Sequence, residues 1–148
     1  MPLTEQEREF VDAMGRHFEA ESVPRIGGRI FGFLLLQELP CSLDDLADQL
    51  EISKASASTN ARLLEDWLLI EKTSIPGDRR DYYQAAADPV RTLEFRLARV
   101  REHGALLEAG ASVASSPVAA QRLRGMARFN AESIEALEPL LARWRART

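Results

Sequence analysis

The N-terminal part of the chain alternates apolar and polar residues at the spacing of an α-helix. After Thr4 and Glu7, which have the spacing of a capping box, apolar residues recur every three or four positions and predict a first helix over residues 4–21. A second, more apolar helix is predicted over residues 24–39, ending before Pro40. Three glycines lower the propensity of this second helix, so we expect another helix to pack closely against it.

The middle of the chain shows two short helices followed by two extended segments. Ser42 begins an amphipathic helix whose apolar residues follow the i, i+3, i+4, i+7 pattern, and Ser53 begins another helix soon after it ends. Two short helices joined by about three residues are the helix-turn-helix pattern. Residues 70–75 and 81–85 are predicted to be extended on either side of a Pro-Gly-Asp turn, which indicates a hairpin. A helix-turn-helix followed by a hairpin is a winged helix.

The C-terminal part returns to helical spacing. An Asp-Pro pair at residues 88–89 and a Ser-Pro pair at residues 116–117 each begin a long helix. These helices carry apolar seams from Val90 to Ala111 and from Ala119 to Trp144. The seams exceed what a small winged helix needs to cover its core, so together with the first helix they predict a dimer interface.

The predicted fold class is therefore mainly α with a small β-hairpin wing. We expect a winged helix-turn-helix domain over residues 24–87. Long helical dimerisation regions, residues 1–23 and 88–148, are expected to pack on it.

The helix predicted over residues 53–67 has an unusual composition. Its first half is rich in Ser, Thr and Asn, which compete with the backbone for hydrogen bonds and weaken helices. Ala57, Ala61 and Leu64 share one helical face, and the opposite face is small and hydrogen-bonding, with one arginine. Such a face fits the DNA major groove, where Ser, Thr and Asn contact base edges or phosphates and Arg pairs with guanine. The residues predicted to contact DNA from this helix are Ser53, Lys54, Ala55, Ser56, Ser58, Thr59 and Arg62.

The predicted hairpin carries a second candidate contact. Arg79 and Arg80 lie at or just after its tip, where a guanidinium can enter the minor groove or bind the flanking phosphates. The alternative is that Asp78 and Asp81 pair with these arginines on a solvated turn. We expect both: one pair shapes the wing and the other arginine stays unpaired.

Charge is unevenly distributed along the chain. The net charge of −4 argues against a protein that coats nucleic acid without specificity. Residues 1–23 carry six acidic and two basic residues, so the remainder is neutral overall. Residues 52–64 contain Lys54 and Arg62 and no acidic residue, which leaves a small surface able to face phosphate.

Three segments resemble a known family. The stretches "VPRIGGRIFGFLLL", "SLDDLADQLEISKASASTNARLLEDWLLIEKTSIPGDRRDYYQ" and "LEPLLARW" are similar to the MarR-type winged-helix regulators, and among them to the GbsR-like branch. This resemblance implies a dimeric, DNA-binding transcriptional regulator with an effector cleft between the winged helix and the dimer helices. By position, residues 53–67 form the recognition helix and Arg79 and Arg80 are the wing arginines. The chain departs from the family in having Ala57 where a bulkier buried residue is expected.

Other chemistry has weaker support in the sequence. His17 and His103 lie in different helices without neighbouring ligands, so neither a metal nor a cofactor is expected. Cys41 is interpreted as a small loop residue, with a redox-sensing thiol as the alternative. The aromatic residues can line an effector cleft, and the GbsR resemblance would suggest a quaternary ammonium ligand, but aromatics at helical spacing are more often core. No catalytic constellation is present, so an enzyme is not expected.

The expected partners are double-stranded DNA, a second copy of the chain and a small-molecule effector. The longest apolar stretch, residues 30–36, is too short to cross a bilayer, and the acidic N-terminus does not resemble a secretory signal, so a cytoplasmic protein is expected. The rival hypothesis is a winged helix that binds proteins and not DNA. A protein-binding module has no reason to exclude carboxylates from residues 52–64, which favours DNA.

Overall fold

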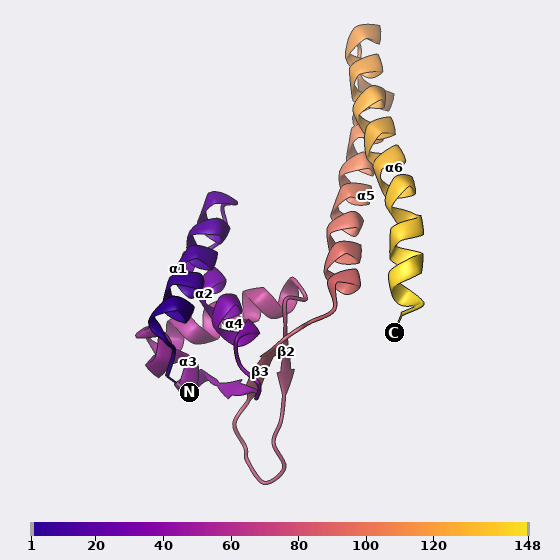
Figure 1. Cartoon of the computed structure of the whole chain (residues 1–148). Coiled ribbons are helices and arrows are strands. Elements are labelled where there is room, and N and C mark those ends of the chain that lie inside the picture. The colour runs from indigo at the N-terminus through magenta and orange to yellow at the C-terminus, as the bar shows by residue number, and fades with distance from the viewer. Residues whose placement is uncertain (1, 148) are drawn as a thin grey trace. The chain divides into compact units, whose positions relative to one another are not determined.

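A computed structural model describes residues 2–147 of the chain. It is mainly helical, with a small antiparallel sheet, as the sequence predicts. The chain forms two compact units, whose boundary falls between Ala87 and Asp88. The elements of the first unit are α1 (Glu5–Ala20), α2 (Arg25–Leu35), β1 (Cys41–Ser42), α3 (Leu43–Leu50), α4 (Lys54–Asp66), β2 (Ile70–Thr73) and β3 (Tyr82–Ala85) (Figure 1). Those of the second unit are α5 (Pro89–Val113) and α6 (Pro117–Arg145).

The helix starts predicted at Thr4, Ser42 and Ser53 are confirmed, and each has a side-chain cap, whereas α2 begins after Pro24 without one. Thr4 and Ser42 form capping boxes with Glu7 and Asp45, and the Ser53 hydroxyl accepts from the Ser56 N–H at 3.1 Å. Each cap satisfies backbone donors that a helix start otherwise leaves without a partner.

The predicted end of the second helix is wrong. α2 stops at Leu35, four residues before the expected end at Leu39. The Leu36 N–H turns to the Phe33 carbonyl at 3.1 Å, which tightens the last turn. The chain then extends toward β1, where Cys41 pairs with Tyr83. α2 therefore ends early because the residues after it must reach β1.

The wing is a three-stranded sheet of order β1-β3-β2 in which both pairs are antiparallel. The predicted hairpin is formed by β2 and β3, and its register sets Ile70 opposite Ala85 and Thr73 opposite Tyr82. The short strand β1 is not predicted by the sequence, because two residues carry no alternating pattern. It pins the start of α3 to the base of the wing, so the helix-turn-helix and the hairpin are held together.

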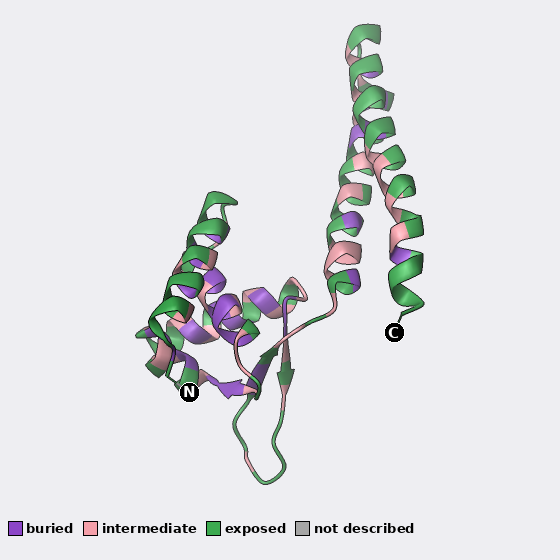
Figure 2. Cartoon of the chain, in the orientation of Figure 1, coloured by how far each residue is buried: buried purple, intermediate pink, exposed green. Residues whose placement is uncertain are grey.

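The core of the first unit lies between α2, α3 and α4. Ile30, Phe33, Leu46 and Leu64 are all fully buried there. Figure 2 shows buried segments on the helices of this unit. A Cβ on Gly28 would lie 2.6 Å from the Met14 carbonyl oxygen, so α1 approaches α2 as closely as a glycine allows. The expected close helix packing at the glycines is thereby confirmed.

The first helix belongs with the winged helix in this structure. α1 packs on α2 inside the first unit, and Val11 and Phe18 are buried in the same core as the residues of α3 and α4. The role expected for residues 1–23 in a dimer stays a prediction.

The second unit is a hairpin of two long helices (Figure 1). The seams predicted for a dimer interface instead pack α5 on α6 within one chain. The buried residues of this contact are Val90, Leu97, Leu107, Ala111, Ala120, Ala127 and Leu141. Among the described residues, no helix is long and apolar enough to cross a membrane.

Candidate nucleic-acid interface

The two faces predicted for α4 are present. Ala57, Ala61 and Leu64 have no exposed surface, whereas Ala55, Thr59 and Arg62 are exposed. Ser56 and Ser58 are half-buried at the edges of the exposed face, and Ser53 and Lys54 are exposed at its start. Ala57 and Ala61 are small enough to let α4 pack directly on its neighbours, so the departure from a bulkier family residue at position 57 is accommodated without exposing the helix.

The outward side chains of α4 bond mainly within their own helix. The Thr59 hydroxyl donates to the Ala55 carbonyl at 3.0 Å, which leaves its lone pairs available to accept. Arg62 Nη2 lies 3.4 Å from Ser58 Oγ, and no carboxylate of the described residues pairs with this guanidinium. Arg62 is therefore an unneutralised cation on the predicted DNA-facing surface.

Asn60 is a structural residue that the sequence-based prediction did not single out. It is buried, and its Nδ2 donates to the Ser56 carbonyl at 2.9 Å. A Cβ on Gly27 of α2 would lie 3.4 Å from its Oδ1, so the two helices touch here. Residue spacing alone could have predicted that Asn60 is buried, since it lies on the same i, i+3, i+4, i+7 stripe as Ala57, Ala61 and Leu64.

Arg29 of α2 braces the turn between α3 and α4. Its Nη2 donates to the Leu50 carbonyl at 3.2 Å, and its Nε donates to Asp12 Oδ1, also at 3.2 Å. Leu50 is the last residue of α3, and Glu51 follows in the left-handed region with φ of 55°. The Arg29 guanidinium thus gives a C-terminal carbonyl of α3 a hydrogen-bond partner. It also links α1 to the turn that sets the orientation of α4.

Lys54 at the start of α4 is ion-paired in the free protein. Its Nζ lies 3.1 Å from Asp44 Oδ1, which belongs to the first turn of α3. Both side chains are more than half exposed, so the pair lies at the surface. Lys54 therefore differs from Arg62, which has no such partner among the described residues.

The wing contains one strong ion pair. Asp78 accepts from the Arg80 backbone N–H at 2.9 Å and from Arg80 Nη2 at 2.7 Å. The Tyr82 hydroxyl donates to the same carboxylate at 2.6 Å. The side-chain hydrogen bond from Arg80, followed by that from Tyr82, holds the pKa of Asp78 well below its usual range. The hydrogen bond to Asp78 raises the pKa of Tyr82.

The two wing arginines follow the prediction that one is ion-paired and the other is not. Arg79 is exposed and has no ion pair among the described residues, while Arg80 is paired. The alternative in which Asp81 also pairs with an arginine is not formed; Asp81 lies 3.7 Å from Lys72 Nζ, which also lies 4.0 Å from Glu65. Of the cations singled out from the sequence, Arg62 and Arg79 are unneutralised.

Cys41 is a poor candidate for a reactive thiol. It is buried in β1, and its Sγ lies 3.6 Å from the Leu39 carbonyl oxygen, to which the thiol donates. Burial, with a smaller contribution from the Asp45 charge, raises the pKa of the thiol to about 11. A raised pKa lowers the thiolate fraction near neutral pH, and with it the reactivity.

Residues 24–81 of the chain match the MarR family. The HTH-type transcriptional regulator MmpR5 of Mycobacterium tuberculosis is 42% identical over 77 residues, which are 51% of this chain and 47% of that protein. The chain thus spans about half the length of this relative. A crystal structure of a transcriptional regulator is 31% identical and superposes with a TM-score of 0.87, covering 95% of this chain and 99% of the other.

Proposed function

Because the chain belongs to the MarR family of winged-helix transcriptional regulators, we propose that it binds double-stranded DNA as a homodimer on a palindromic operator. In this proposal α4 enters the major groove, and the wing lies over the adjacent backbone or minor groove. The contacting residues are those predicted from the sequence: Ser53, Lys54, Ala55, Ser56, Ser58, Thr59, Arg62, Arg79 and Arg80.

The observation that carries the proposal is the charge pattern of α4. Its exposed face presents Arg62, which no carboxylate of residues 2–147 neutralises, in a protein of net charge −4. The other side chains on that face are small, so the helix backbone can approach base edges closely. A surface selected to bind an ordinary protein partner would not need to be small and to lack acidic residues over residues 52–64. We accordingly favour DNA over a protein-binding scaffold.

A second copy of the chain is proposed to cover an outer stripe on the hairpin of the second unit. Val118 and Phe129 of α6 are 64% and 72% exposed, and Leu106 and Val113 of α5 are 70% and 82% exposed. Large apolar side chains in such numbers are uncommon on a monomer surface. The seams first assigned to the dimer are already used between α5 and α6, so these outward residues are the better interface candidates.

Charge complementarity favours a second copy as the occupant. Residues 102–113 of α5 contain Glu102 and Glu108 and no Lys or Arg. Residues 117–131 of α6 contain three arginines and no acid. A two-fold dimer that places α5 of one copy beside α6 of the other therefore brings opposite charges together around the apolar stripe.

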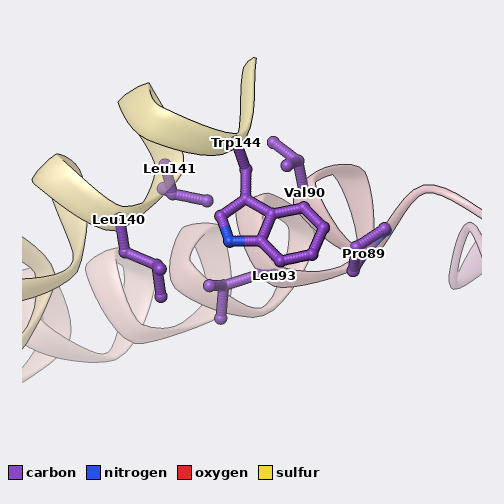
Figure 3. A pocket seen from close by; sticks show the side chains of 6 residues that line it. All are labelled: Pro89, Val90, Leu93, Leu140, Leu141 and Trp144. Carbon is purple, nitrogen blue, oxygen red and sulfur yellow. The ribbon is translucent and has the colours of Figure 1, made fainter. Parts of the chain in front are cut away.

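A small-molecule effector is the third part of the proposal. The second unit has a pocket of about 340 Å³ lined by Pro89, Val90, Leu93, Leu140, Leu141 and Trp144 (Figure 3). Its size suits a small, largely apolar molecule. Trp144 is the one aromatic lining residue, and the Arg147 guanidinium lies 4.8 Å from its ring centroid, so a complete aromatic cage for a quaternary ammonium is not formed there. Assignment to the GbsR-like branch rests on the sequence resemblance.

The proposed function is tested by selecting bound DNA from a random-sequence pool with the full chain. We expect enrichment of an inverted repeat whose half-sites lie about one helical turn, 10 to 10.5 base pairs, apart. Failure to enrich any sequence, together with no retention of duplex DNA at low salt, would reject DNA binding. A protein-binding scaffold would then be the better description.

A further inference from the structure

Lys54 and Asp44 form an ion pair across the two helices of the helix-turn-helix. Lys54 is the first residue of α4, and Asp44 lies in the first turn of α3. Their charged atoms are 3.1 Å apart, and the side chains are 64% and 52% exposed. Both groups are therefore open to solvent and to an approaching phosphate.

The position of this pair matters because an N-terminal lysine of a recognition helix is well placed to bind phosphate. The residues next to it along α4 carry no acid. The carboxylate closest to Lys54 therefore comes from a different helix, and it neutralises a cation that the sequence alone would count as available to DNA.

We propose that Asp44 is a positioning residue for DNA binding, which holds the Lys54 ammonium group and reduces what Lys54 contributes to phosphate binding; this rests on the proposed DNA-binding function. When DNA approaches, Lys54 must exchange a carboxylate for a phosphate, so little net attraction is gained. Asp44 thereby limits binding to any duplex, and the unpaired Arg62 and Arg79 are left as the main charged contacts.

The proposal predicts a gain of affinity when this carboxylate is removed. Asp44→Asn should raise the affinity for a scrambled duplex roughly 1.4- to 5-fold for each copy bound, the range given by exposed ion pairs. The dependence of log affinity on log salt should steepen by about 0.9 per copy, because one more phosphate is neutralised. A misfolded variant would bind more weakly, so damage to α3 cannot imitate this result.

Two control variants separate the ion pair from general repulsion. Asp48→Asn removes the same charge from the same exposed side of α3, but Asp48 has no ion pair among the described residues; its salt slope should stay unchanged. In a Lys54→Gln background, Asp44→Asn should have no effect, since the cation that it releases is absent.

The experiment is a salt titration of wild type, Asp44→Asn, Asp48→Asn, Lys54→Gln and the Asp44→Asn, Lys54→Gln double variant on one scrambled duplex. An unchanged affinity in Asp44→Asn overturns the proposal. So does an equal rise in the Lys54→Gln background, which would mean that Asp44 simply repels phosphate. If the wild type retains no duplex at low salt, the proposed function fails and this inference fails with it.

Discussion

The Asp78 carboxylate binds both the backbone and the guanidinium of Arg80, with 2.7 Å between Oδ2 and Nη2. Tyr82, which is buried in β3, bonds to the same carboxylate. Asp78 therefore links the tip of the wing to its base, and Arg80 serves the shape of the wing. The neighbouring Arg79 has no ion pair among the described residues, so the two adjacent arginines have different expected roles.

The wing arginines should give separable effects on DNA binding. Arg79→Ala should weaken binding to all sequences about equally and flatten the salt dependence by roughly 0.9 for each phosphate that is no longer neutralised. Arg80→Ala should mainly loosen the wing, with a smaller change in slope and a larger decrease in affinity for the specific operator. A salt titration of both variants on operator and scrambled DNA measures this. Equal slopes for Arg79→Ala and wild type would exclude Arg79 as a phosphate ligand.

Arg62 is expected to contribute sequence specificity. Arg62→Ala should weaken operator binding by roughly 1 to 3 kcal/mol, the range for a bidentate contact to a base, and relax the preference at one position of each half-site. Operator variants at each base pair, compared by equilibrium binding, locate that position. A decrease in affinity that is the same on operator and scrambled DNA would instead assign Arg62 to the phosphate backbone.

Gly28 should be essential to the packing of α1 on α2. A Cβ there would lie 2.6 Å from the Met14 carbonyl oxygen, so Gly28→Ala should lower the free energy of unfolding by roughly 1 to 3 kcal/mol. Gly125→Ala is the matched control, because Gly125 is in a helix with nothing within 4 Å of its would-be Cβ. It should be neutral or stabilising by up to about 1 kcal/mol. Urea unfolding of both variants measures this difference. Similar free energies of unfolding for Gly28→Ala and Gly125→Ala would contradict the close approach of α1 to α2.

The outer stripe of the hairpin should determine the oligomeric state. Phe129→Asp inserts a charge into the proposed interface and should shift the protein toward monomer in sedimentation at micromolar concentration. Ala142→Asp adds the same charge at an exposed position of α6 that lies off the face of Val118 and Phe129, and it should leave the assembly unchanged. A wild type that sediments only as a 16.6 kDa species would remove the dimer from the proposed function.

The Cys41 thiol should react slowly in the folded protein. At pH 8 a thiol reagent should modify it far more slowly than in urea, because the folded pKa is about 11 and the side chain is buried. Because the pKa of the thiol is higher in the folded than in the unfolded protein, the thiol makes its whole contribution to stability at pH values below the unfolded pKa. That contribution disappears as the pH rises toward 11. Rapid labelling of the native protein at pH 8 would contradict this prediction and support a redox-sensing role for Cys41.

Local features were predictable from the sequence because their causes lie within a few residues. Caps at Thr4, Ser42 and Ser53 act over three positions, so the helix starts were predicted correctly. The two faces of α4 follow from helical periodicity alone, which is also why its small outward surface could be predicted. The same reasoning extended to the hairpin, whose turn residues are adjacent in the chain.

Only the tertiary structure decided which groups meet from distant parts of the chain. The strand at Cys41 exists because β3 lies beside it, and two residues have no pattern of their own to indicate this. Lys54 is neutralised by a carboxylate of another helix, whereas no carboxylate in the described part of the chain neutralises Arg62, although both lie in the same acid-free segment. The apolar seams of α5 and α6 have a spacing that suits either a partner chain or each other, and packing in space assigned them to each other. Periodicity specifies which face of a helix is buried, but the identity of the surface that buries it depends on the folded chain.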